Sequence, residues 1–89
     1  MPNPKTIAKW MLEELTREET LYQEEVVNDI VSKFGEEFAY INNNGNLAID
    51  KQVLLEFRIL TEKTVVWERG ERFWRFREDY DNPETRFAE

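Results

Sequence analysis

The stretch that decides the fold is TVVWERGERFWRFR, which spans residues 64–77. It holds two of the three Trp, two of the six Phe and four of the twelve basic residues, arranged around Gly70. Apolar and polar residues that alternate on both sides of a glycine are typical of a β-hairpin. The sequence therefore predicts an aromatic and basic hairpin over about Lys63 to Arg77.

The turn of this hairpin predicts which residues pair. A two-residue turn at Arg69-Gly70 would place Arg72 opposite Trp67, where the guanidinium can stack on the indole ring. The two faces then consist of Val65, Trp67, Trp74 and Phe76 on one side and Val66, Phe73, Arg75 and Arg77 on the other. We expect the first face to pack on the rest of the protein, because the opposite choice would bury arginines.

Three segments before the hairpin are predicted to be helices, since each has apolar residues three and four positions apart. The expected helices are about Pro4–Arg17, Gln23–Phe34 and Lys51–Thr61. Asn3 precedes the first helix and Asp50 precedes the third, and both are favourable N-cap residues. The layout is therefore α+β, with three helices followed by a hairpin.

Two connections between the helices are less regular. Thr20–Tyr22 is short and extended in character. Phe38–Ile41 is compatible with a strand or a buried loop. The longer stretch Phe38–Ile49 is compatible with a strand, a loop or a fourth short helix. Asn42–Asn46 is predicted to be a turn, because Asn and Gly tolerate positive φ angles.

The apolar positions of these elements predict a single core. Its expected members are Ile7, Met11, Leu15, Val27, Ile30, Val31, Phe34, Val53, Leu54, Phe57, Leu60, Val65, Trp67 and Trp74.

Length and composition restrict the class of protein. A chain of 89 residues makes one small domain, here residues 1–78, followed by an acidic tail at residues 79–89. The absence of Cys and His removes thiolate metal sites and the commonest general base. No apolar run is long enough for a membrane helix or a signal peptide, so we expect a cytoplasmic protein.

The net charge of −7 is unevenly distributed along the chain. Residues 63–77 carry five basic and two acidic side chains, whereas residues 78–89 carry one basic and five acidic side chains. An acidic domain is poorly suited to nucleic acid, because phosphate neutralisation supplies most of the non-specific affinity. The basic hairpin is the exception to this acidic balance.

Three helices, a short extended piece after the first helix and a terminal hairpin resemble the winged helix-turn-helix superfamily. The stretch FAYINNNGNLAIDKQVLLEFRILTEKTVVWERGERFWRFRE resembles a group of short uncharacterised bacterial proteins of this build. The resemblance covers about Ile7 to Arg77. It implies a winged-helix-like fold in which the extended piece Thr20–Tyr22 pairs with the hairpin, or wing. In DNA-binding members of the superfamily the third helix enters the major groove and the wing touches the backbone, so the third helix would be the recognition helix here. The resemblance brings no catalytic residues.

The outer face of the third helix is the first candidate binding site. Leu55 and Ile59 are four residues apart and form an apolar ridge, while Glu56 would repel phosphate. The expected partner-binding residues are Gln52, Leu55, Glu56, Arg58 and Ile59. This face suits a protein partner better than DNA bases, which are usually contacted by basic and amide side chains. Alternatively, Leu55 and Ile59 pack under the hairpin or the tail.

The wing is the second candidate site, because it mixes basic and aromatic side chains. The expected wing contacts are Arg69, Arg72, Phe73, Arg75 and Arg77. Alternatively, the aromatic residues belong to the core and the arginines pair with Glu68, Glu71 or the acidic tail. A tail that folds over Arg75 and Arg77 would compete with phosphate.

Residue types needed for catalysis are scarce. Adjacent glutamate pairs such as Glu13-Glu14 diverge by about 100° on a helix and do not converge on a substrate. Ser32, the only serine, lies within a predicted helix and has no histidine to activate it. We therefore expect no enzyme activity, cofactor, metal or small-molecule substrate.

The function that follows is a non-enzymatic interaction module that binds protein, either itself or a larger partner, through the third helix and the wing. The alternative is a DNA-binding regulator that uses the arginine-rich wing for phosphate contacts. A third reading, an accessory subunit without autonomous activity, has the same sequence features as the first.

Overall fold

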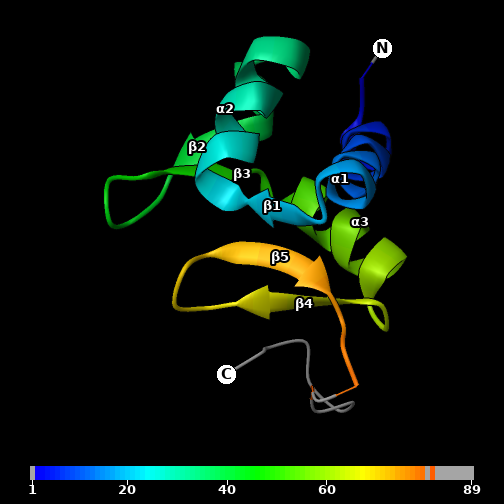
Figure 1. The fold of residues 1–89 in the computed structure, drawn as a ribbon. Coiled ribbons are helices and arrows are strands. Elements are labelled where there is room, and N and C mark those ends of the chain that lie inside the picture. The colour runs from blue at the N-terminus through cyan, green and yellow to red at the C-terminus, as the bar shows by residue number, and fades with distance from the viewer. Residues whose placement is uncertain (1, 80, 82–89) are drawn as a thin grey trace.

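Residues 2–79 and 81 are described by a computed structural model, in which three helices lie above a small antiparallel sheet (Figure 1). The helical elements are α1 (Pro4–Glu18), α2 (Gln23–Phe34), α3 (Lys51–Thr61) and one 3-10 turn, η1 (Glu36–Phe38). The strands are β1 (Thr20–Tyr22), β2 (Ala39–Ile41), β3 (Leu47–Ile49), β4 (Val65–Glu68) and β5 (Phe73–Phe76). The predicted α+β class is confirmed.

The helix ends follow the capping signals of the sequence. The Asn3 side chain accepts a hydrogen bond from the Thr6 N–H at 2.9 Å, and the Asp50 side chain accepts one from the Gln52 N–H at 3.2 Å. Both caps satisfy N–H groups that a helix start otherwise leaves without a partner. The bounds predicted for α2 and α3 are confirmed, and α1 ends one residue later than predicted.

The first sheet joins the hairpin to the segment after α1. Its strand order is β1-β5-β4, and the β1–β5 pairing sets Leu21 opposite Trp74. The expectation that Thr20–Tyr22 pairs with the hairpin is confirmed. Because β1 lies between α1 and α2 in the chain, this pairing holds both helices against the hairpin.

The predicted register of the hairpin is wrong by two residues. Trp67 pairs with Trp74, and Glu68 pairs with Phe73, so a four-residue turn replaces the two-residue one. The Arg72 N–H donates to the Glu68 carbonyl oxygen at 2.8 Å, and Arg72 has a φ of 61°. Arg72 therefore does not lie opposite Trp67; the Trp67 ring instead lies 4.7 Å from the Trp74 ring, between centroids.

The predicted division of the two hairpin faces survives this shift, because side chains alternate with a period of two. Trp74 lies on the inner face and meets the Phe57 ring of α3 edge-on, with centroids 5.3 Å apart. Arg75 lies on the outer face, opposite Val66.

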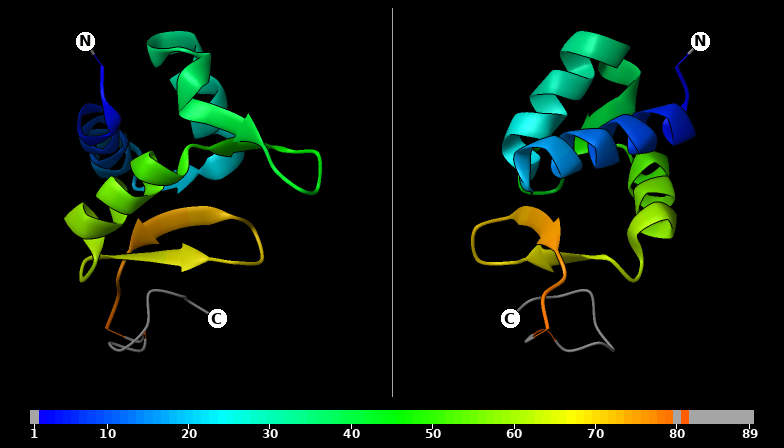
Figure 2. Two further views of the ribbon diagram at one scale, coloured as in Figure 1. Left: turned by 180° about the vertical axis from the view of Figure 1, so that it is seen from behind. Right: turned by 45° about the vertical axis from the view of Figure 1, so that its right-hand side comes forward.

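A second hairpin, β2–β3, occupies the connection between α2 and α3 (Figure 2). Its turn is held by Asn42, whose side-chain oxygen accepts the N–H groups of Asn44 and Asn46, each at 3.0 Å. Gly45 supplies a φ of 79° there. The described residues thus contain more strands than the predicted wing, and the winged-helix arrangement stays a prediction.

The core lies between the helices and the inner face of the β1-β5-β4 sheet. Helix α1 packs chiefly on α3, while α2 packs on the β2–β3 hairpin. Most of the predicted core is buried, but Leu60 is 40% exposed, so its assignment to the core is wrong. Buried residues of the helices and strands that the predicted core left out are Ala8, Leu21, Val26, Phe38, Ala48, Ile49, Thr61 and Val66.

Among the described residues, no helix is both long enough and apolar enough to cross a membrane.

Candidate functional site

The outer face of α3 exposes two large apolar side chains. Leu55 is 47% exposed and Ile59 is 61% exposed, and they lie one helical turn apart. We call this pair the α3 ridge. The opposite face of α3 is anchored by Val53 and Phe57, which are fully buried. Because both side chains are exposed, the hairpin does not cover the α3 ridge. The other alternative, packing under the tail, falls largely on residues outside the described part of the chain.

Charged and polar side chains surround the α3 ridge. Gln52 and Arg58 are exposed, and Glu56 is half-buried. At the start of the helix, the Lys51 ammonium lies 5.9 Å from the centre of the Tyr40 ring of β2. The predicted partner-binding residues are therefore on the outer side of one helix, with Glu56 the least accessible of them.

The five predicted wing contacts lie partly in the turn of the hairpin and partly on β5 or directly after it. Arg69 and Arg72 are exposed at the turn of the hairpin, and the Arg72 guanidinium donates to the Gln23 side-chain oxygen at 3.5 Å. Phe73 is half-buried and stacks on Tyr22, with ring centroids 4.8 Å apart. These residues lie at the end of the sheet where β1 meets α2.

The remaining two arginines lie near the other end of the hairpin. The Arg77 guanidinium donates through Nε to the Lys63 carbonyl oxygen at 3.3 Å, which joins the end of β5 to the start of β4. The Arg75 side chain is only 14% exposed. The Arg77 hydrogen bond therefore holds the two strands of the hairpin together at this end.

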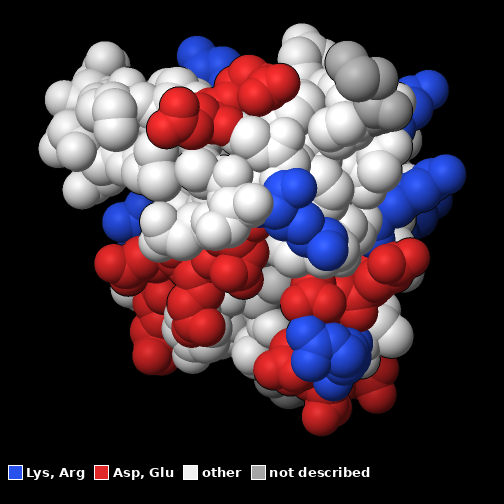
Figure 3. All heavy atoms as spheres, turned by 90° about the horizontal axis from the view of Figure 1, so that it is seen from above, with Lys and Arg blue, Asp and Glu red and all other residues white. Residues whose placement is uncertain are grey.

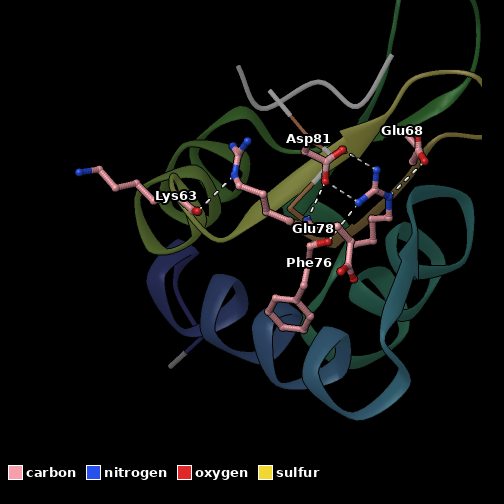
Figure 4. A network of polar contacts seen from close by, with 7 residues as sticks. Lys63, Glu68, Phe76, Glu78 and Asp81 are labelled. Carbon is pink, nitrogen blue, oxygen red and sulfur yellow. Dashed lines mark hydrogen bonds and ion pairs between the residues drawn. The ribbon is translucent and has the colours of Figure 1, made fainter. Parts of the chain in front are cut away.

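Arg75 is the centre of a polar network on the outer face of the sheet (Figure 4). Its Nη1 and Nη2 donate to the two carboxylate oxygens of Asp81, each at 2.9 Å. Its Nε donates to Glu68 at 3.1 Å, and Nη1 also donates to the Phe76 carbonyl oxygen at 3.2 Å. A bidentate pair of this kind is strong and directional. The predicted tail pairing is therefore present at Asp81.

The network stabilises the ionised form of Asp81. Hydrogen bonds from Arg75 and then from the backbone N–H of Glu78 lower the pKa of Asp81 to about 2, and the nearby positive charges act in the same direction. The carboxylate side chain is almost fully covered, at 2% exposed. Asp79 and Asp81 belong to the predicted tail, whose other residues lie outside the described part of the chain.

A cavity of about 300 Å³ lies between α1 and α2, at a position that the sequence pattern did not indicate. Its lining includes Trp10 and Tyr22 together with four acidic side chains, Glu14, Glu18, Glu25 and Asp29. Figure 3 shows acidic side chains over much of the lower part of this view and again near its top, with basic side chains among them.

Adjacent glutamates do diverge, as expected, but residues four apart on a helix share a face. Glu14 and Glu18 on α1 and Glu25 and Asp29 on α2 have this spacing, which is the signal that could have revealed the cavity lining. Arg17 neutralises part of the negative charge of this cavity lining, since its guanidinium lies 2.6 Å from Glu14 and 2.7 Å from Glu18.

Within residues 2–79 and 81, no group of three or more His, Cys, Asp or Glu residues is arranged to hold a metal ion.

Comparison with known proteins assigns a family to the chain. No curated protein and no solved structure matches the sequence. One family model matches residues 3–76, and its description is "Family of unknown function (DUF6953)". The matched region runs from the N-cap of α1 to the last residue of β5. The chain therefore belongs to the DUF6953 family of unknown function.

Proposed function

We propose that this protein is a non-enzymatic interaction module that binds another protein chain, either a copy of itself or a larger partner, through the α3 ridge and the adjoining wing. The observation that carries the proposal is the exposure of Leu55 and Ile59, 47% and 61%, on the outer face of a helix whose inner face is fully buried. Large exposed side chains at i and i+4 are the anchors by which a helix docks against a partner.

The charge of the α3 face supports a protein partner over a phosphate backbone. Residues 51–62 carry two basic and two acidic side chains, so this segment is neutral in a chain of net charge −7. Helices that contact DNA bases normally display side chains that donate hydrogen bonds to base edges. An apolar ridge with Glu56 and Glu62 beside it offers few such donors and repels phosphate.

The packing of α3 supports the same proposal, because a rigid surface loses little conformational freedom on binding. Phe57 packs against Trp74 of the hairpin, and α3 packs along α1. The outward side chains of α3 are therefore presented from a backbone that two neighbouring elements, α1 and the hairpin, hold in place.

Site-specific crosslinking tests the proposal. A photo-crosslinking amino acid at position 52, next to the α3 ridge, is expected to form a protein adduct in cells that produce the chain. Leu55→Lys combined with Ile59→Lys should abolish the adduct without lowering the melting temperature, because both side chains are exposed. Ile41→Lys is the matched control, since Ile41 is 64% exposed on a different surface. An adduct that persists in the double variant refutes the proposal.

DNA binding through the wing is the competing function, and the exposed positions of Arg69 and Arg72 favour it. Fluorescence anisotropy of a random-sequence duplex at low and moderate salt tests this alternative. Saturable binding that weakens steeply with salt and is lost on Arg69→Glu with Arg72→Glu would support DNA binding. An unchanged anisotropy at low salt would exclude it.

A further inference from the structure

We infer that the partner of the α3 ridge is a second copy of this chain, docked with the two α3 helices antiparallel about a two-fold axis. The inference rests on the proposed function and names the partner for the same surface. It follows from the order of side chains along α3, which makes this face complementary to itself.

An interface with two-fold symmetry requires one patch to match its own rotated copy. Consider an antiparallel helix pair whose two-fold axis passes between Glu56 and Phe57. Each residue then faces the residue of the second copy for which the two residue numbers add up to about 113. Leu55 of one copy then meets Ile59 of the second copy within about one residue rise, 1.5 Å. The α3 ridge therefore packs against itself, and it does so twice in the same interface.

The charged residues of α3 fit the same register. Lys51 and Glu62 are eleven residues apart, which is three turns plus about 20°, so both lie on one side of the α3 ridge. Glu62 keeps helical backbone angles, with φ −54° and ψ −37°, and therefore continues the same spiral. A two-fold axis places Lys51 of one copy opposite Glu62 of the second copy, and the reverse pair forms at the other end. Both side chains are exposed in the single chain.

The distribution of charge over the molecule also favours this face. Two chains of net charge −7 repel one another. The cavity between α1 and α2 is lined by four acidic side chains and one arginine, so bringing two such surfaces together would add to the repulsion. Residues 51–62, with two basic and two acidic side chains, offer a neutral apolar face where copies approach without this penalty.

Sedimentation equilibrium of the full chain tests the inference. Concentrations up to about 1 mM are needed, because an interface made by a single helix from each copy is small and supports only weak association. We expect a monomer–dimer equilibrium that Leu55→Lys with Ile59→Lys abolishes. Lys51→Glu alone and Glu62→Lys alone should each weaken the dimer about three- to tenfold, since each removes two symmetric ion pairs. The Lys51→Glu/Glu62→Lys double variant restores the opposite charges and should recover the wild-type dissociation constant.

The outcomes separate this inference from the proposed function. A dimer that responds to the ridge and recovers in the charge-exchanged variant supports the inference. A dimer that ignores all α3 substitutions overturns it, and so does a chain that stays monomeric at every concentration. If the chain is monomeric while the crosslinker at position 52 still captures a different protein in a ridge-dependent manner, only the second-copy inference fails. If neither occurs, the proposed function fails with it.

Discussion

At the scale of single residues, Asp81 is a carboxyl group whose pKa the fold lowers. Its pKa of about 2 lies below the ordinary value of 3.8 because Arg75 and the Glu78 N–H stabilise the carboxylate. A lowered pKa means that the ion pair stabilises the folded state above pH 3.8 and that this contribution is lost as the pH falls from 3.8 towards 2. The Arg75–Asp81 ion pair on the outer face of the hairpin is therefore weakened by strong acid.

An NMR titration checks this dependence. The Glu78 amide donates to Asp81 at 2.8 Å, so its chemical shift should titrate with a midpoint of about 2 rather than 3.8. Asp81→Asn should remove the titration and lower the melting temperature at pH 7. Asp79→Asn is the control, because Asp79 is exposed and should leave both properties unchanged. A midpoint near 3.8 would show that Arg75 does not hold the carboxylate.

A second prediction compares two apolar residues of α3. Phe57 is fully buried against Trp74, so Phe57→Ala should cost about 3–5 kcal/mol in the free energy of unfolding. Leu60→Ala should change it by only about 0.5 kcal/mol, because Leu60 is 40% exposed. Urea denaturation measures both values. A larger loss for Leu60→Ala than for Phe57→Ala would mean that α3 is rotated relative to this structure.

At the scale of one element, the turn of the β4–β5 hairpin contains a residue with a positive φ angle. Arg72 has a φ of 61°, a left-handed conformation that costs a residue with a side chain about 1–2 kcal/mol and costs glycine almost nothing. Arg72→Gly should therefore stabilise the protein by up to about 1 kcal/mol, and its melting temperature should rise. Glu71→Gly, one position earlier, should lower the melting temperature. If Glu71→Gly stabilises and Arg72→Gly destabilises, the four-residue turn is wrong.

The elements also explain why the α3 ridge exists. Helix α3 needs only one side to close the core, because α1 and the hairpin both contact that side. Its inward residues recur at helical spacing, and the same spacing places Leu55 and Ile59 on the outward side. A polar residue at either position would leave the core unchanged, so these two apolar side chains are free to serve the binding that we propose for this face.

For the whole molecule, we expect the acidic tail to compete with any polyanion for the arginines of the wing. Residues 79–89 carry four acidic side chains and one basic side chain. One of the acidic side chains, Asp81, accepts two hydrogen bonds from the Arg75 guanidinium. Deleting residues 79–89 should therefore raise the affinity for duplex DNA or heparin, most clearly at low salt. Anisotropy titrations of the full and shortened chains measure the difference. The same deletion combined with Arg75→Glu is the control, and equal affinity of the full and shortened chains would exclude masking.

Much of this fold could be predicted from local signals. The bounds of α2 and α3, the N-caps Asn3 and Asp50, and the membership of the two hairpin faces all depend on spacing and capping within a few residues. The exposed positions of Leu55 and Ile59 follow from helical periodicity as well. The sequence alone therefore determined the helices, the hairpin and the apolar face of α3, because each is set by interactions between near neighbours.

Contacts between distant segments decided the rest. The hairpin register depends on the pairing of Leu21 with Trp74 and on the packing of Phe57 against Trp74. The predicted and the observed register place the same residues on each face, so the alternation of side chains could not distinguish them. The carboxylates lining the α1–α2 cavity meet only when two helices cross. Arg75 becomes a buried ion-pair centre only when Asp81 folds onto the sheet. Tertiary structure decided these features because their energies come from residues that sequence periodicity does not relate to one another.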